Sequence, residues 1–313
     1  MRDFWQGKQV LVTGGAGFIG ACVVAALRQR GVSHERIVAP RSQDCDLRHV
    51  DNCRAAVRDC SIVIHLAAST GGIAFSRAHS ASQYRDCSLM NLNMLEAARE
   101  AAVDKFVAIG NLLAYPAAAA SPLREECLHD GPVAATHLGI GLAKRDLVAL
   151  TGMYHREHGL NAVSILAANA YGPRDRFDAP HSHVIPATIA KCFRDEDLVV
   201  WGDGSPTRDF LFVEDLAEGI LLAAERLDAP GVVNLASGHE VSIGDLVRLI
   251  AGLAGFRRRI EFDASKGGGD PRRVASTVKA TQLIGFSPRV SLDEGLRRTI
   301  DWYKKTLAEP VPR

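Results

Sequence analysis

The residues with the clearest chemical meaning lie near the N-terminus, where a glycine-rich turn separates an apolar run from a helical pattern. Gly14, Gly17 and Gly20 follow the spacing G-x-x-G-x-x-G, and Phe18 and Ile19 lie between the last two glycines. Glycines in this setting permit a tight turn and let the backbone approach a pyrophosphate, which free N–H groups at the positive end of a helix then hold. The turn therefore predicts a dinucleotide-binding site.

A second group of candidate residues combines cations with one aromatic side chain in the last third of the chain. Arg208 and Lys266, with Arg272 or Arg273, can neutralise a diphosphate, and arginine can do so through two parallel hydrogen bonds. Trp201 offers an aromatic face to a base or a sugar. The 37 basic and 36 acidic side chains give a net charge of +1, which lacks the basic surplus typical of nucleic-acid binders. We therefore expect a small diphosphate ligand and no nucleic acid.

Short aliphatic runs alternate with helical patterns along the first half of the chain, and these elements must position the glycine turn. Strands are predicted at 9–13, 36–39, 61–65, 105–109 and 161–166, and helices at 17–29, 50–58, 80–102 and 138–158. Strands separated by helices indicate βαβ crossovers and a parallel sheet. After residue 170 turn signals become frequent, and three further helices are predicted at 213–226, 242–253 and 291–306.

This order of elements predicts an α/β fold with a Rossmann-type doubly wound parallel sheet and a smaller C-terminal α/β lobe. We assign residues 1–168 to the cofactor domain, to which 208–235 returns, and 169–313 mainly to substrate binding. The stretch 266–273 combines glycines with cations, which suits either a mobile anion clamp or a solvated loop.

Composition narrows the remaining classes of protein. The chain is 47% hydrophobic but has no apolar run long enough to cross a membrane, so no membrane partner is expected. Its 7 cysteines form no C-x-x-C pair and no Cys/His ligand spacing, so we expect reduced thiols, no metal site and a cytoplasmic location. The N-terminus has no apolar segment of the kind found in signal peptides.

The motifs together resemble those of the extended short-chain dehydrogenase/reductase superfamily. The glycine spacing, Asp46-Leu47, and Leu66-Ala67-Ala68 are similar to the cofactor-contacting segments of that superfamily. The segments that more specifically resemble the GDP-fucose synthase branch are 70–73, 115–116, 169–177, 182–187, 200–204, 208–211 and 262–266. This resemblance implies a GDP-hexose substrate and a homodimer formed through the helices 80–102 and 138–158. The substrate contacts that it implies are Gly72, Asn169, His183, Val184, Lys191, Trp201, Arg208, Lys266 and Arg272.

The reaction centre departs from the pattern of that family. The family has Tyr-x-x-x-Lys on one helix, where the lysine lowers the tyrosine pKa, but here Lys144 follows Ile140, which cannot move a proton. The family's serine and cysteine near the fourth strand are replaced within Asn111-Leu112-Leu113. A family asparagine is replaced by Cys87. Ordinary epimerisation and 4-keto reduction should therefore be nearly abolished.

Four residues remain as candidates for proton transfer or for hydrogen bonding to the sugar. His183 resembles the acid/base histidine of the family, Lys144 could hold the nicotinamide ribose or act as a desolvated base, and Asn111 could donate to a sugar oxygen. His137 lies one helical turn before the apolar position and could approach the same pocket, although a packing role is favoured for it. Tyr115 is expected to pack beside the site.

A complete binding site beside altered proton chemistry suggests a redox-neutral cycle. A sugar hydroxyl would be oxidised, the transient ketone would permit epimerisation or pyranose/furanose interconversion, and the same hydride would return. The alternatives are a 3,5-epimerase/4-reductase of GDP-4-keto-6-deoxymannose and a non-catalytic nucleotide-sugar or dinucleotide-binding module.

The residues that follow the second predicted strand are those that distinguish NAD from NADP in such folds. Residues 39–42 carry no acid that would bind a ribose 2′-hydroxyl and only one arginine, Arg41, that could bind a 2′-phosphate. Ala16 lies where some NADP-using members have an arginine. We favour NAD, with NADP as the other possibility.

Overall fold

A parallel sheet of six strands forms the centre of the computed structural model, which describes residues 4–178, 182–266 and 270–308. The strand order is β2-β1-β3-β4-β5-β9, and every neighbouring pair in it is parallel. The bounds are β1 Val10–Thr13, β2 Ile37–Val38, β3 Ile62–His65, β4 Lys105–Asn111, β5 Ala162–Ala167 and β9 Val232–Leu235. The predicted Rossmann-type α/β fold is confirmed.

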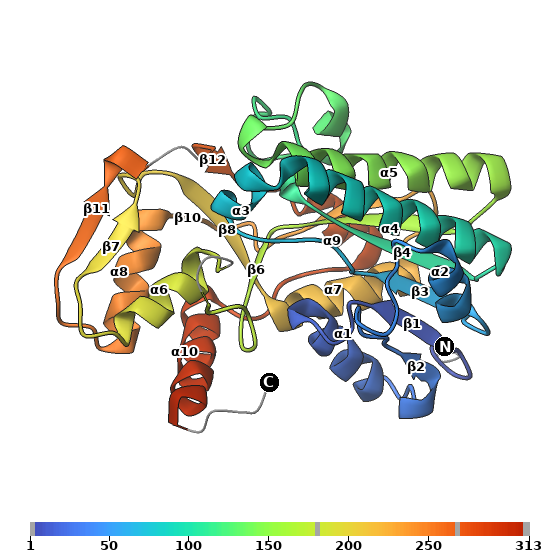
Figure 1. Cartoon of the computed structure of the whole chain (residues 1–313), viewed down its shortest axis with the longest axis horizontal. Coiled ribbons are helices and arrows are strands. Elements are labelled where there is room, and N and C mark those ends of the chain that lie inside the picture. Colours follow the sequence, from blue (N-terminus) through green and yellow to red (C-terminus); the bar gives the residue numbers. More distant parts are fainter. Residues whose placement is uncertain (1–3, 179–181, 267–269, 309–313) are drawn as a thin grey trace.

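Helices cover both faces of this sheet (Figure 1). On one face α1 (Phe18–Gln29) packs against α7 (Val213–Arg226), with α9 (Val278–Ile284) beside α7. On the other face α4 (Ser80–Glu100) packs between α2 (Val50–Val57) and α5 (Leu138–His158).

The strand residues alternate between these two layers, because successive side chains of a strand point to opposite faces. Val10 and Val12 belong to the cluster that holds α1 and α7, whereas Leu11 belongs to the cluster that holds α2, α4 and α5. Strands buried on both faces read as continuous aliphatic runs, which explains why the central strands could be recognised from the sequence.

A smaller lobe lies beside the carboxyl ends of the strands of the central sheet, at the left of Figure 1. One of its sheets contains β10 (Glu240–Ser242), β8 (Thr207–Phe212) and β12 (Arg272–Arg273), with β6 (Asn169–Tyr171) also paired to β8. A second, parallel pair joins β7 (Leu198–Trp201) to β11 (Ile260–Asp263). The helices of the lobe are α6 (Val184–Cys192), α8 (Ile243–Ala254) and α10 (Leu292–Ala308), and the short α3 (Ile73–Ala78) precedes α4.

Most predicted elements agree with the structure to within a few residues, but several were missed. The three helices predicted after residue 170 are present as α7, α8 and α10, whereas helices α3, α6 and α9 were not predicted. The second strand is only Ile37–Val38, shorter than expected. The predicted cap of α10 is present, since the Glu294 N–H donates to Ser291 Oγ at 3.3 Å. Residues 267–269 of the glycine stretch lie outside the described residues.

The structure bears on the expectations of reduced thiols and of no membrane-spanning segment. The seven cysteines are all free thiols. Among the described residues, no helix is long and apolar enough to cross a membrane.

Candidate active site

The glycine turn forms a tight cradle at the carboxyl end of β1. The strand order reverses between β1 and β3, and ligands of open α/β sheets bind at such a switch point. A Cβ atom on Gly20 would lie 2.1 Å from the Gly14 carbonyl oxygen, so α1 can approach the turn this closely only without a side chain. Gly17 is the N-cap residue of α1 and has no side chain to bind the free N–H groups there, and no acidic residue lies in the first turn. The cradle fits a dinucleotide pyrophosphate, with Phe18 and Ile19 beginning the helix.

The predicted cofactor residues Arg41, Asp46 and Leu47 lie in the segment between β2 and α2. Leu47 is buried, and its carbonyl oxygen accepts a hydrogen bond from Asn93 of α4. The Asp46 carboxylate accepts two hydrogen bonds from the Arg48 side chain Nε and Nη2, which lowers the Asp46 pKa to about 2. Arg41 is exposed near the end of β2. Contact of these residues with a cofactor remains a prediction.

The loop after β3 closes the cradle from the other side. The N–H groups of Leu66 and Ala67 both donate to Thr13 Oγ1 at 3.1 Å. Ala68 packs against the small cluster of Cys87, Ile140 and Ala143. The predicted cofactor residues 66–68 thus connect the glycine turn to the altered reaction centre.

Lys144 and Ile140 lie together in the buried part of α5. Lys144 is only 4% exposed, and its Nζ donates to the Ile109 carbonyl oxygen at 2.7 Å. Burial lowers the pKa of Lys144, while Cys87 opposes that shift. Ile140 is 3% exposed. At this position, where the short-chain dehydrogenase/reductase family has a tyrosine, the protein therefore has a buried apolar side chain.

The segment that replaces the family's serine and cysteine is held by three cations. Its backbone carbonyl oxygens at Ile109, Leu112 and Ala114 accept hydrogen bonds from Lys144, Arg273 and Arg145, at 2.7, 2.9 and 2.7 Å respectively. The Asn111 side chain accepts from the Leu113 N–H, which begins the turn Leu112–Ala114. Its amide NH₂ has no partner among the described residues and could donate to a ligand.

A close approach of α5 to this segment depends on Gly141. A Cβ atom there would lie 2.7 Å from the Leu113 carbonyl oxygen. Gly141 therefore allows α5 to lie against the segment Leu112–Ala114. Tyr115 follows as a fully buried residue whose hydroxyl donates to Asn234, in agreement with the expected packing role.

Arg208 and Arg273 form the main cationic group near the site. They are register partners on β8 and β12, and Arg273 is buried with its Nε 2.6 Å from Asp270. One buried nitrogen of Arg273, Nη2, has no hydrogen-bond partner within the described parts of the chain, and such a group favours an anionic ligand. His137 lies within the field of this group, and burial together with both arginines lowers its pKa, while Asp270 opposes the shift. The structure therefore places His137 beside the predicted diphosphate site.

Arg272 is engaged elsewhere. Its guanidinium donates to both carboxylate oxygens of Glu240, at 2.8 and 2.7 Å, and to the Ser121 carbonyl oxygen. Of the two arginines weighed from the sequence, Arg273 is the one that lies with Arg208. Substrate binding by Arg272 would require a ligand to compete with Glu240.

Trp201, Lys266 and Lys191 form a second group in the smaller lobe. Trp201 is 56% exposed at the end of β7, and Lys266 Nζ lies 6.0 Å from its ring centre, in the range of a cation–π contact. Lys266 also pairs with Asp263 at 3.2 Å. Lys191 Nζ donates to the Val199 carbonyl oxygen, and burial lowers its pKa, with Arg194 and Lys266 adding to the shift. An exposed indole flanked by cations is suited to stacking on a nucleobase.

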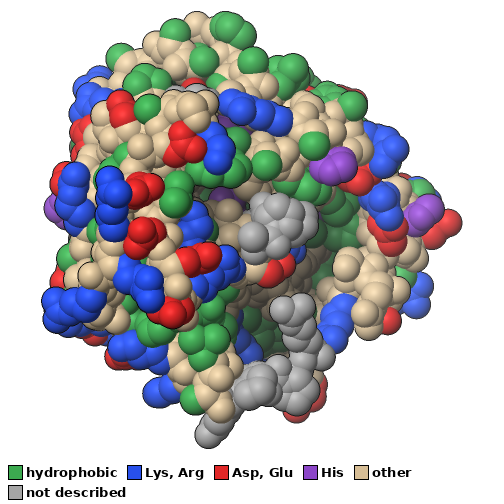
Figure 2. Space-filling view, turned by 60° about the vertical axis from the view of Figure 1, so that its left-hand side comes forward, with side chains coloured by type: hydrophobic (Ala, Val, Ile, Leu, Met, Phe, Trp, Pro, Cys, Tyr) green, Lys and Arg blue, Asp and Glu red, His purple; other side chains and the backbone are tan. Residues whose placement is uncertain are grey.

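His183 caps the N-terminus of α6, which begins at Val184. Its side chain is exposed, yet the surrounding protein lowers its pKa, with Arg176 adding to the shift. Figure 2, in which the left-hand side of Figure 1 is turned forward, shows a recess near the centre of the face, with Lys and Arg side chains near it.

The remaining predicted substrate residues lie at the ends of elements around the site. Asn169 begins β6, and its Nδ2 donates to the Asp209 carbonyl oxygen, next to Arg208. Gly72 caps the N-terminus of α3. Direct contact of either residue with a substrate remains a prediction.

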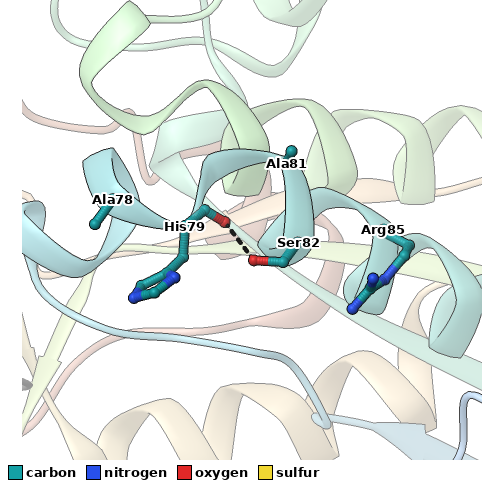
Figure 3. Close-up of a pocket in the computed structure, with 5 residues that line it drawn as sticks. All are labelled: Ala78, His79, Ala81, Ser82 and Arg85. Carbon is teal, nitrogen blue, oxygen red and sulfur yellow. Dashed lines mark hydrogen bonds between the residues drawn. The ribbon is translucent and has the colours of Figure 1, made fainter.

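A separate depression of about 390 Å³ lies where α3 ends and α4 begins (Figure 3). It is lined by Ala78, His79, Ala81, Ser82 and Arg85, and Ser82 Oγ donates to the His79 carbonyl oxygen at 3.1 Å. None of these residues belongs to the reaction centre.

Fold, cradle and buried lysine define a nicotinamide-dependent enzyme of the extended short-chain dehydrogenase/reductase class. Residues 10–236 match the NAD dependent epimerase/dehydratase family, to which the chain belongs. The chain is 32% identical over 311 residues to the GDP-L-fucose synthase of Sinorhizobium fredii, covering 97% of this chain and 98% of the relative. It is 30% identical to the Escherichia coli GDP-L-fucose synthase, with 95% of this chain and 96% of that protein covered. Among solved structures, a GDP-L-fucose synthetase of Naegleria fowleri bound to NADP superposes with a TM-score of 0.88 at 26% identity, covering 97% and 96% of the two chains. The predicted family resemblance is confirmed.

Some residues of the site were not found from the sequence. Asp270 follows the glycine stretch and pairs with Arg273 three residues later, a spacing that could have been noticed. Arg145 and the buried Asn91 were not singled out, because their partners lie far away in the sequence or on another element.

Proposed function

We propose that the protein catalyses an NAD(P)-dependent, redox-neutral isomerisation of a GDP-hexose, of the epimerase or pyranose/furanose mutase type. The observation that carries this proposal is the contrast within one site. The pyrophosphate cradle and the Arg208–Arg273 group are intact, whereas Ile140 and Leu112 are buried apolar residues where the family has proton-transfer groups. The GDP-L-fucose synthases among the relatives support the choice of a GDP-sugar.

The chain's own residues must bind the diphosphate and move one proton. Arg208 and Arg273 would hold the diphosphate, and Trp201 would stack on the base. Oxidation of a sugar hydroxyl releases a hydride and a proton, and a bound nicotinamide supplies the hydride acceptor and donor. Lys144 or one of the histidines His183 and His137 would take the proton and return it.

Lys144 is the residue best suited to this proton transfer or to the orientation of the reacting groups. Its burial favours the neutral amine, and it has a single acceptor, the Ile109 carbonyl oxygen, among the described residues. The other hydrogen-bonding positions of Nζ are therefore available to a ribose hydroxyl or to the sugar. Asn111 could donate its free NH₂ group to a sugar oxygen.

We propose NAD as the preferred cofactor. Ala39 and Ala16 offer no charge to a 2′-phosphate, and Arg41 is the one cation among residues 39–42. A cofactor that is regenerated in each cycle also needs no cellular reductant. The NADP-bound neighbour keeps NADP as the alternative.

The names of the relatives favour a second candidate, a 3,5-epimerase/4-reductase of GDP-4-keto-6-deoxymannose. This activity would require Lys144, His183 or His137 to replace a phenol, a hydroxyl and a thiol. A non-catalytic binding module is the third candidate, and it would need only the cradle and the cations.

One experiment separates the three candidates. The purified protein is incubated with a panel of GDP-hexoses and stoichiometric NAD or NADP, and products are identified by ion-exchange chromatography and NMR. The isomerase predicts a new GDP-sugar without net change in NAD(P)H absorbance. Steady NAD(P)H consumption with GDP-4-keto-6-deoxymannose would instead establish the reductase, and binding without conversion would establish the module.

We further propose that the protein is a cytoplasmic homodimer. Five of the exposed large hydrophobic residues lie on the adjacent helices α4 and α5, which the family resemblance assigns to the subunit interface. They are Tyr84, Leu89, Leu92, Leu138 and Met153. The free thiols agree with a reducing compartment.

A further inference from the structure

A chain of buried polar groups crosses from the glycine turn to helix α5. Thr13 ends β1, His65 ends β3 and Asn91 lies in the middle of α4, and all three are at most 1% exposed. Thr13 Oγ1 lies 2.8 Å from His65 Nδ1, and His65 Nε2 lies 3.1 Å from Asn91 Oδ1. Asn91 Nδ2 donates to the Ala143 carbonyl oxygen at 3.2 Å. This chain of polar groups therefore ends at the residue that precedes Lys144.

The donor and acceptor roles in this chain are fixed by its ends. Thr13 Oγ1 already accepts the N–H groups of Leu66 and Ala67, so its own hydrogen must point to His65 Nδ1. The proton of the neutral imidazole is then on Nε2 and is donated to Asn91 Oδ1, which leaves the Asn91 NH₂ group for Ala143. Each heteroatom in the chain has a partner, and the imidazole is held in one tautomer.

Charge on His65 would break this arrangement. A proton on Nδ1 would face the Thr13 hydroxyl hydrogen, and the cation would lie in the field of Lys144. Burial and the Lys144 charge accordingly lower the pKa of His65 to about 3. The ring is a fixed dipole and not a proton carrier at neutral pH.

The two ends of this chain of polar groups belong to different parts of the proposed site. One end holds Leu66 and Ala67, which close the cradle, and the other holds the helix backbone at Ala143. Lys144 itself is anchored to Ile109 of β4. The chain is thus a direct polar link between the cofactor loops and the helix that carries the lysine.

We propose that His65 and Asn91 are positioning residues that set the place of Lys144 relative to the cofactor loops. The proposal rests on the proposed function in one respect, which is that Lys144 contacts a bound dinucleotide. It assigns His65 and Asn91 no contact with the cofactor or the sugar.

A double-mutant cycle on dinucleotide binding tests the proposal without a sugar substrate. Kd for NAD and NADP is measured for the wild type, Asn91→Leu, Lys144→Met and the double variant. Asn91→Leu should weaken binding about tenfold, the loss expected for one misplaced hydrogen bond, and should add almost nothing in the Lys144→Met background. Independent, additive losses would show that Asn91 supports only the fold and would overturn the proposal.

Two variants of the histidine provide a matched comparison. His65→Gln can still donate to Asn91, whereas His65→Leu cannot, so His65→Gln should retain tighter dinucleotide binding at a similar thermal unfolding midpoint. Equal losses in both variants would contradict the proposed link. ¹⁵N NMR of the full-length wild type should show His65 in the Nε2–H tautomer without titration between about pH 5 and 8, a window in which ordinary histidines titrate; titration there would also overturn it.

These results separate this proposal from the proposed function. Non-additive coupling without conversion of any GDP-hexose would refute the isomerase and support the positioning role. Turnover together with additive losses would support the isomerase and refute the positioning role. A wild type that binds neither dinucleotide would refute both.

Discussion

At the scale of single residues, the site depends on a buried lysine that has lost its usual phenolic partner. Lys144→Met should lower kcat of the proposed isomerisation by about 10²–10⁴-fold, since general acid–base catalysis contributes about that much. The affinity for GDP should remain, because the Arg208–Arg273 group is unchanged. Steady-state kinetics and GDP titration check this expectation. Lys305→Met, which alters an exposed lysine of α10, is the matched control.

The pH dependence of turnover tests the same residue. Burial lowers the pKa of Lys144, so if the neutral amine is the base, kcat should rise with pH through a pKa below the ordinary lysine value of 10.5. This rise should be missing from the residual activity of Lys144→Met. An identical pH profile in wild type and variant would assign the proton transfer to His183 or His137.

Asp175 gives a residue-scale prediction about stability. Its Oδ2 is buried and has no hydrogen-bond partner among the residues that the structure describes, and burial raises the pKa of this carboxyl to about 7 from 3.8. The folded state then binds more protons than the unfolded state between these two values, so the contribution of Asp175 to stability falls as pH rises from about 4 to 7. Asp175→Asn should therefore stabilise the protein at pH 8, by about 1–3 kcal/mol, and change little near pH 4. Urea unfolding at both pH values measures the difference, and equal effects at the two pH values would contradict it.

At the scale of elements, the glycine turn and helix α1 act as one unit. Gly20→Ala would place a Cβ atom 2.1 Å from the Gly14 carbonyl oxygen, so the turn or the helix must shift. Dinucleotide affinity should fall by at least about tenfold, or about 1.4 kcal/mol. Gly252→Ala is the control, because a Cβ atom there meets nothing within 4 Å on helix α8. Titration followed by protein fluorescence distinguishes the two variants.

Elements with a strong internal pattern could be predicted from the sequence, and elements that depend on distant partners could not. Helix α5 was predicted with its observed bounds, because 21 residues of helical pattern end at Gly159, which adopts a left-handed conformation. Strand β12 has only two residues and exists because Arg272–Arg273 pair with β8. The same holds for the site. The glycine spacing and Lys144 are local signals, whereas the bond from Arg273 to the Leu112 carbonyl joins residues 161 positions apart. Sequence patterns carry the first kind of information and not the second.

At the scale of the whole molecule, two lobes contribute unequally to the site. The turn after β1 forms the cradle and helix α5 carries Lys144, while β8 and β12 of the smaller lobe carry Arg208 and Arg273. Arg273 links the lobes directly through the Leu112 carbonyl oxygen. A diphosphate bound by Arg273 would therefore act on the segment beside Lys144.

The α4–α5 surface provides the last prediction at this scale. Leu89 and Leu92 are 39% and 42% exposed on α4, and Leu138 and Met153 are 44% and 50% exposed on the neighbouring α5. A pair of helices that meets a second copy of itself would bury these side chains in a four-helix contact and give a two-fold dimer. Leu89→Glu with Leu92→Glu should convert the dimer to a monomer, because the introduced carboxylates would be buried without partners. Leu283→Glu with Leu307→Glu, at exposed apolar positions on α9 and α10, should leave the dimer intact. Light scattering coupled to size-exclusion chromatography gives the mass of each variant, and a monomeric wild type would refute the assigned interface. Dinucleotide binding should persist in the monomer, since the cradle and Lys144 come from a single chain.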